Sequence, residues 1–230
     1  MPLLLRRARA AVPDRAPSVA LVSLAMFVVI EGIEGSGKTT LLAGLAEKLS
    51  RTGREVVVTR EPGGTPLGDS IRAVFVSRML AIEPLAEALL VNASRAQHVD
   101  AVIRPALKAG RIVICDRFVD STLAYQGYGR GLDLEELRRI CDIATRGLEP
   151  DLVLLIDMPY EVSQSRLQQR DEALDRIEQE NGGFHERVRQ GFLALAKSPR
   201  HCVLDGRLPP ERLLEEALSA VHERLSTPLR

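Results

Sequence analysis

A glycine-rich segment near residue 35 carries the clearest chemistry in this sequence. Gly32, Gly37, Lys38 and Thr39 satisfy the pattern G-x-x-x-x-G-K-S/T, directly after a short apolar run and before a helical one. Glycines allow a tight turn that points backbone N–H groups at phosphate oxygens, and the following helix adds positive potential. The pattern predicts a site for ATP and Mg²⁺, formed by Gly32, Ile33, Glu34, Gly35, Ser36, Gly37, Lys38, Thr39 and Thr40.

Two side chains of this segment have separate expected roles. Lys38 is expected to be catalytic, because its ammonium group can reach the β and γ phosphates of the nucleotide. The Thr39 hydroxyl is expected to bind Mg²⁺, which bridges the same phosphates and neutralises charge during transfer. The alternative is a chance match in a glycine-rich turn. The apolar run before the segment and the helical one after it favour nucleotide binding.

Two later apolar runs end in charged residues. One is followed by Asp116 and Arg117, and the other by Arg60 and Glu61 before a Pro-Gly-Gly turn. We expect Asp116 to be catalytic and to hold Mg²⁺ together with Thr39, and Arg117 to clamp an acceptor phosphate through two hydrogen bonds. Arg60 is expected to bind substrate and Glu61 to order metal-bound water, since burying this pair at a sheet end is costly unless it is used. The alternatives are an aspartate that caps the next turn and a turn that only connects elements.

A charged segment from Tyr160 to Arg176 follows another apolar run. It contains Arg166, Arg170 and Arg176 among acidic residues. Such a charge run is usually a solvated helix, but phosphoryl transfer between two nucleotides requires the exclusion of water. A mobile cover that bears arginines excludes water and stabilises charge at once. We therefore expect a lid around residues 160–180 with at least one of these arginines in the active site.

Strands and helices that position these residues can be read from hydrophobic patterns. The short apolar runs are β-branched, which is typical of strands buried on both faces of a parallel sheet. Segments of helical period separate them, and Asp133 with Glu136 is expected to cap one helix. The alternation predicts an α/β fold with the site at the carboxyl edge of the sheet. The expected strands are Phe27–Ile30, Glu55–Thr59, Ile112–Cys115, Leu152–Ile156 and His201–Leu204, and the expected helices are Leu41–Ser50, Pro84–Ala109, Leu134–Thr145 and Glu211–Leu225.

Composition limits the partners and the compartment. The 230 residues include 31 basic and 31 acidic side chains, so no overall charge attracts nucleic acid or a membrane surface. The three cysteines have no metal-binding spacing, which favours buried thiols in a reducing, cytoplasmic compartment. Residues 1–25 are rich in Ala and Arg without regular periodicity and are expected to form a flexible extension. Residues 26–230 are expected to form one domain, and Met26 is an alternative start.

Several longer motifs together identify a family. EGIEGSGKTT, TREPGGT, SRAQH, DRFVDSTLAYQGYGRG and LDRIEQE resemble the bacterial thymidylate kinases, and the match extends from Met26 to about Arg224. The resemblance implies a P-loop NTPase fold with a five-stranded parallel sheet of order 2-3-1-4-5 between helices. It also implies a homodimer and the reaction of ATP with dTMP to give ADP and dTDP.

The resemblance also implies roles for individual residues. Arg95 and Arg117 would bind the dTMP phosphate, and Glu34 would lie near the sugar 3′-hydroxyl. Because Gly35 occupies the loop position where some members carry a basic residue, catalytic charge would come from Arg170, with Arg166 as second choice. The residues expected around thymine and deoxyribose are Arg72, Thr122, Tyr125 and Gln126.

One position departs from the family pattern and leaves the acceptor open. Val91 stands where the family usually has a phenylalanine that stacks on thymine, so either Phe75 replaces that ring or dTMP binds more weakly. The rival functions are a P-loop kinase for another nucleoside monophosphate or a deoxynucleoside, and a P-loop ATPase switch. The sequence lacks the D-x-x-G and N-K-x-D motifs of a GTPase switch.

Overall fold

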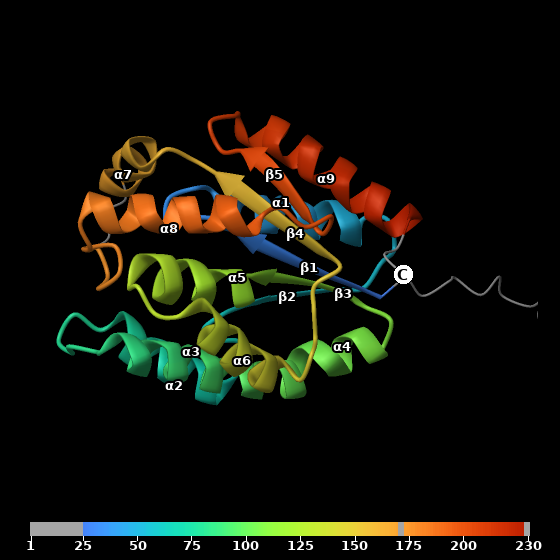
Figure 1. Ribbon diagram of the computed structural model, residues 1–230. Helices are drawn as coiled ribbons and strands as arrows, with labels where there is room; N and C mark the ends of the chain where they lie inside the picture. Colours follow the sequence, from blue (N-terminus) through green and yellow to red (C-terminus); the bar gives the residue numbers. More distant parts are fainter. Residues whose placement is uncertain (1–24, 170–172, 228–230) are drawn as a thin grey trace, which may run out of the picture.

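A computed structural model describes residues 25–169 and 173–227 and shows a five-stranded parallel sheet (Figure 1). The strand order is β2-β3-β1-β4-β5, as the family resemblance implies. In the central pairings Val28 is aligned with Ile114 of β3 and with Leu152 of β4. The strands are β1 (Met26–Glu31), β2 (Val56–Arg60), β3 (Ile112–Asp116), β4 (Leu152–Asp157) and β5 (His201–Asp205).

Helices cover both faces of the sheet, and the alternation of side chains along β1 explains why (Figure 1). Met26, Val28 and Ile30 pack against α1 and α9, whereas Phe27 and Val29 pack against η1 and α4 on the other face. The described helices are α1 (Lys38–Ser50), α2 (Pro66–Val76), α3 (Pro84–His98), η1 (Val99–Ile103), α4 (Arg104–Lys108), α5 (Val119–Thr122), η2 (Leu123–Gly129), α6 (Leu134–Thr145), α7 (Tyr160–Gln168), α8 (Gly182–Leu195) and α9 (Pro210–Ser226).

All five predicted strands are confirmed, and each extends one residue further at its carboxyl end. The added residues are all charged and lie along one edge of the sheet, because the strands are parallel. This edge therefore concentrates ionisable groups where the sequence predicts the site. The added residues are Glu31, Arg60, Asp116, Asp157 and Asp205.

Predicted helices are confirmed with one difference. Helix α6 has the predicted bounds, and the Asp133 side chain accepts hydrogen bonds from the backbone N–H groups of Glu135 and Glu136. The segment predicted as one helix over 84–109 is instead α3, a π-helical stretch and α4. Pro105 has no N–H to continue the α-helical ladder, and the wider turn lies directly before it.

The lid and the amino-terminal extension are described only in part. The predicted lid begins with α7 and continues in turns from Arg176 to Gln179. Arg170 and nearly all of the predicted extension lie outside the described residues. Among the helices of residues 25–169 and 173–227, none is long and apolar enough to cross a membrane.

Candidate active site

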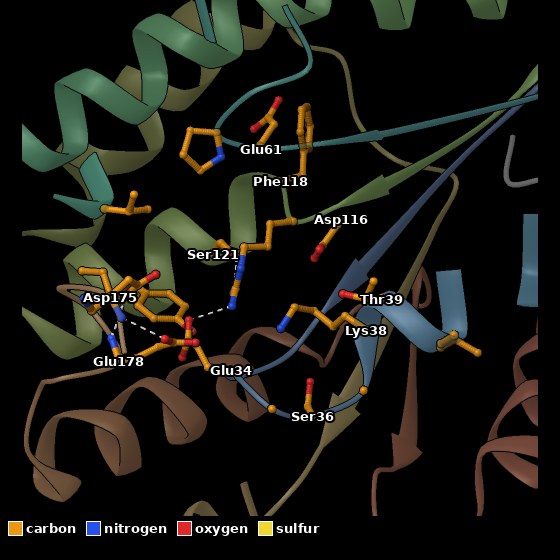
Figure 2. Close-up of a pocket in the computed structure, with 18 of the residues that line it drawn as sticks. Glu34, Ser36, Lys38, Thr39, Glu61, Asp116, Phe118, Ser121, Asp175 and Glu178 are labelled. Carbon is orange, nitrogen blue, oxygen red and sulfur yellow. Dashed lines mark hydrogen bonds and ion pairs between the residues drawn. The ribbon is translucent and has the colours of Figure 1, made fainter. Parts of the chain in front are cut away.

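A pocket of about 660 Å³ opens at the carboxyl edge of the sheet (Figure 2). It brings together most of the predicted site residues from the phosphate loop, α2, α3, the end of β3 and the segments after β2 and β3. Gly32, Ile33 and Arg60 are not among its lining residues. The predicted residues that line it are Glu34, Gly35, Ser36, Gly37, Lys38, Thr39, Thr40, Glu61, Arg72, Arg95, Asp116, Arg117, Thr122, Tyr125 and Gln126.

The phosphate loop is built on backbone conformations that favour glycine. Gly32 has a φ of 141°, and a Cβ atom there would come within 2.6 Å of the Ile156 carbonyl oxygen. The Lys38 ammonium donates to the carbonyl oxygens of Gly32 at 3.0 Å and Ile33 at 2.8 Å. Burial, together with the positive charge of Arg117, lowers the pKa of Lys38 to about 8. Gly32 and Ile33 thus serve the site by holding the lysine rather than by lining the pocket.

Asp116 at the end of β3 provides a carboxylate oxygen for a cation. Its Oδ1 atom is buried and has no hydrogen-bond partner among the described residues. Asp116 and Thr39 point into the same part of the pocket beside Lys38 (Figure 2). A carboxylate and a hydroxyl at one site match the oxygen ligands that Mg²⁺ prefers. The residues present therefore fit the predicted metal.

Arg117 is held in a left-handed backbone conformation with a φ of 71°, which is uncommon for a residue other than glycine. Its Nη2 donates to Glu34 Oε1 at 2.8 Å, and its Nη1 donates to the Ser121 hydroxyl at 3.1 Å. The Tyr125 hydroxyl donates to the same Glu34 oxygen at 2.6 Å. Burial raises the pKa of Glu34, but Arg117 and Lys38 outweigh it and leave that pKa below its ordinary value.

Glu31 is a functional residue that the sequence analysis missed. It is fully buried, and its Oε1 accepts from the backbone N–H groups of Phe118 at 2.8 Å and Ser121 at 3.2 Å. Its Oε2 accepts from the Ser121 hydroxyl at 2.6 Å. Burial and the charge of Asp120 raise the pKa of Glu31 to about 7. Glu31 thereby fixes the turn that carries Arg117, and its place directly after the strand was the only sequence signal.

Arg95 is the centre of a buried hydrogen-bond network. It is 2% exposed, and its Nε donates to Glu61 Oε2 at 2.7 Å. Its Nη1 donates to Asn92 Oδ1 and Thr122 Oγ1, and one Nη2 hydrogen is used by the Phe118 carbonyl oxygen. One N–H group of Arg95 is left without a partner among the described residues. Arg95 can therefore offer a ligand a single hydrogen bond while its network stays intact.

The expectation that Arg60 is buried beside Glu61 is wrong. The Arg60 side chain is 56% exposed and faces Asp69 at 3.8 Å. Consecutive residues of an extended chain point to opposite sides, so Glu61 points inward while Arg60 points to solvent. Both oxygens of Glu61 are engaged, by Arg95 and by His98 Nδ1 at 3.0 Å. These contacts favour Glu61 as a support for Arg95.

Several apolar side chains form a wall of the pocket, here called the apolar wall. Phe75 and Val91 both line it, together with Val76 and Ile177. The Arg176 guanidinium carbon lies 5.2 Å from the centroid of the Phe75 ring. Phe75, on the neighbouring helix α2, thus lines the same pocket as Val91, and its replacement of the expected ring stays a prediction.

Arg166 is the described lid arginine that lies nearest the phosphate loop. Its Nη1 atom is 4.0 Å from the position of a Cβ atom built on Gly37, and its Nη2 donates to the Gly206 carbonyl oxygen at 3.1 Å. Leu208 and Pro210 line the pocket on the same side. Arg176 points elsewhere and pairs with the buried Glu87.

The fold and the site define a class of protein. A glycine-rich loop after β1 shares one pocket with Arg72, Arg95 and Arg117 at the carboxyl edge of a parallel sheet. This is the arrangement of a P-loop phosphotransferase. The family model described as thymidylate kinase matches residues 30–217. The chain therefore belongs to the thymidylate kinase family.

Known relatives agree with this assignment over most of the chain. The thymidylate kinase of Deinococcus radiodurans is 50% identical over 205 residues, which cover 88% of this chain and 99% of that protein. The thymidylate kinase of Carboxydothermus hydrogenoformans is 51% identical over 190 residues, covering 83% and 93% of the two chains. The crystal structure of thymidylate kinase from Ehrlichia chaffeensis is 35% identical with a TM-score of 0.70, and it covers 86% of this chain and 98% of that one.

The raised pKa of Glu31 predicts a pH-dependent stability difference between the wild type and Glu31→Gln. A carboxyl whose folded pKa is raised from 4.5 to about 7 stabilises the fold fully below pH 4.5 and loses this contribution as the pH rises through about 7. The stability of the wild type relative to Glu31→Gln should therefore fall by on the order of 2–3 kcal/mol between pH 4.5 and 8. Urea denaturation across this range measures the difference.

Glu34→Gln is the matched control for this experiment. The pKa of Glu34 is lowered, so its contribution is present above pH 4.5 and is lost only as the solution becomes more acidic. The stability difference for Glu34→Gln should therefore stay level from pH 5 to 8. A level difference for Glu31→Gln over the same range would contradict the raised pKa.

Proposed function

We propose that this chain transfers the γ-phosphoryl group of ATP to dTMP and releases ADP and dTDP. The observation that carries the proposal is the shared pocket of the phosphate loop and Arg117, where Lys38 and Arg117 come from separate elements and lie close enough for the charge of Arg117 to lower the pKa of Lys38. Two positively charged side chains in one pocket suit two phosphate groups that meet end to end. Membership of the thymidylate kinase family supports this choice of donor and acceptor.

ATP would occupy the half of the pocket formed by the phosphate loop. Lys38 and the loop N–H groups would bind its phosphates, and Arg166 with Leu208 and Pro210 would lie along the adenine. Asp116 and Thr39 would hold Mg²⁺, which supplies charge neutralisation for the phosphates. Arg170 remains a prediction as catalytic lid arginine, and Arg166 is the described alternative.

dTMP would occupy the other half of the pocket, with its phosphate at Arg117. Arg117 has N–H groups beyond those given to Glu34 and Ser121, so it can bind a phosphate without losing its own supports. Arg95 would add at most the one hydrogen bond that its network leaves. Phe75 would stack on the base in the space that Val91 leaves open.

The remaining predicted acceptor residues also line this half of the pocket. Glu34 would accept a hydrogen bond from the sugar hydroxyl, since its Oε2 is buried without a hydrogen-bond partner among the described residues. Arg72 donates to the Pro62 carbonyl oxygen at 3.3 Å and would approach the nucleotide from α2. Catalysis would rest on positioning and charge, because an ionised acceptor phosphate needs no strong general base.

A panel of acceptors tests the reaction and its alternative together. ATP is supplied with dTMP, dUMP, dCMP, dGMP or AMP, and ADP release is followed in a coupled assay. We expect the largest kcat/KM for dTMP, because the apolar wall and Gln126 suit a pyrimidine base. A clear preference for a purine nucleotide would support another nucleoside monophosphate kinase. Lys38→Ala should lower kcat by at least about 100-fold with an unchanged circular dichroism spectrum, as loss of a charge-stabilising group does.

We also propose that two copies associate through α2 and α3. Leu67 and Val74 lie on one face of α2, and Leu85 and Leu89 lie one turn apart on α3, with each side chain between 41% and 53% exposed. The two helices pack against each other, so these side chains form one apolar region of the kind that marks protein interfaces. A cytoplasmic location also remains a prediction.

Leu89→Lys tests this association. A charge in the centre of an apolar interface is costly to bury, so the variant should be monomeric where the wild type is dimeric. Light scattering after gel filtration measures the mass. Val203→Lys is the control, because Val203 is similarly exposed, at 48%, but lies on the edge strand β5, outside α2 and α3. This variant should keep the mass of the wild type. A monomeric wild type would contradict the proposal.

A further inference from the structure

Glu87 is a fully buried carboxylate behind the acceptor half of the pocket. It lies on α3 four residues before Val91 and eight before Arg95, which places the three on one face of the helix. Its Oε1 accepts from Arg130 Nη2 at 3.0 Å and from Arg176 Nη1, and its Oε2 accepts from Arg130 Nε at 3.2 Å. Two guanidinium groups thus balance the charge of this one carboxylate.

The same carboxylate fixes the orientation of the Gln126 amide. Gln126 Nε2 donates to Glu87 Oε2 at 3.1 Å. A carboxylate between two guanidinium groups only accepts hydrogen bonds, so the nitrogen of the amide must face Glu87 and the carbonyl oxygen must face away. One N–H group of Gln126 is therefore committed before any ligand binds.

The rest of the Gln126 amide is available to a base. Gln126 lines the same pocket as Phe75, Val91 and Thr122. Among the described residues, no hydrogen bond engages the side-chain carbonyl oxygen of Gln126 (Oε1) or the second N–H of its side-chain amide. The amide therefore presents a hydrogen-bond acceptor and a donor beside the place where we expect the base of the acceptor nucleotide.

We propose that Glu87 is a positioning residue that sets the base selectivity of the acceptor site by fixing the Gln126 amide. The inference rests on the proposed function, because it concerns the acceptor of that reaction. A pyrimidine with an N3–H and a 4-carbonyl group donates to the Gln126 carbonyl oxygen and accepts from the remaining N–H. Cytosine presents the opposite pattern, an acceptor at N3 and an amino group at C4. The fixed amide favours thymine or uracil over cytosine.

Arg176 links Glu87 to Phe75 in the apolar wall. Its Nη1 donates to Glu87, its Nε donates to the Phe75 carbonyl oxygen at 3.0 Å, and its guanidinium group lies over the Phe75 ring. One carboxylate thereby positions both the amide that faces the edge of the base and the ring that faces its plane.

Glu87→Gln tests the proposal because it can place a hydrogen-bond donor beside Gln126, where the wild type has an acceptor. The new carbonyl oxygen should replace Oε1, which accepts from both arginines, and the new amide nitrogen should replace Oε2 beside Gln126, where the single 3.2 Å hydrogen bond from Arg130 Nε is lost. The nitrogen would donate to the Gln126 carbonyl oxygen, and the Gln126 amide would then turn its N–H groups to the base. We expect the ratio of kcat/KM for dTMP to that for dCMP to fall about tenfold or more, as expected for a reversed bidentate contact, mainly through KM.

Glu180→Gln is the matched control. Glu180 pairs with Arg130 in the same network, whereas the side-chain hydrogen bond of Gln126 goes to Glu87. The Glu180→Gln variant should be less stable than the wild type, but its ratio of kcat/KM for dTMP to that for dCMP should be unchanged. An equal change of the ratio in both variants would overturn the proposal, because it would make the loss of charge responsible and not the amide orientation.

Gln126→Leu keeps the test decisive if Glu87→Gln does not fold. Leucine fills a similar volume but forms no hydrogen bond, so dTMP should lose its advantage while dCMP gains nothing. An unchanged ratio in Gln126→Leu, or in a folded Glu87→Gln, would overturn the proposal. Failure of the proposed function is distinguishable from these results, because the wild type itself would then show no transfer to dTMP.

Discussion

Two glutamates fix the position of Arg117 beside the phosphate loop, and the site depends on the ion pair between Arg117 and Glu34. Glu31 binds the turn that follows β3 through Phe118 and Ser121, and Glu34 binds the guanidinium itself. A left-handed backbone at a residue other than glycine persists only where its surroundings impose it. These contacts impose it, and they direct a positive charge toward the place where Lys38 approaches from the loop.

Buried charges recur around this contact because each has a partner that balances it. Glu61 supports Arg95 and His98, and Glu87 supports Arg130 and Arg176. A lone buried ion would cost several kcal/mol, so each carboxylate restricts its partners to one arrangement. Helix α3 carries Glu87, Arg95 and His98, so one helix positions both groups of buried charges. Rigid support of this kind suits a reaction that depends on the position of two phosphate groups.

The sequence predicted those features whose signal is local. The strands were predictable because a parallel sheet buried on both faces requires continuous apolar runs, and the phosphate loop because its glycines and Lys38 are adjacent in sequence. The contacts of Glu31 and Glu87 were not predictable, since their partners lie more than 30 residues away along the chain. Arg60 was misplaced because its neighbour Glu61 alone points inward. The order of the strands and the acceptor residues other than Arg60 and Arg117 came from the family resemblance, not from periodicity.

A crystal structure with ADP and dTMP bound together would show whether Arg117 binds the acceptor phosphate. We expect the ADP phosphates in the loop beside Lys38, and the dTMP phosphate within hydrogen-bonding distance of Arg117. We also expect Arg117 to keep its left-handed backbone and its contacts with Glu34 and Ser121. A dTMP phosphate bound away from Arg117, or a turn after β3 that has left Glu31, would contradict this role of Arg117.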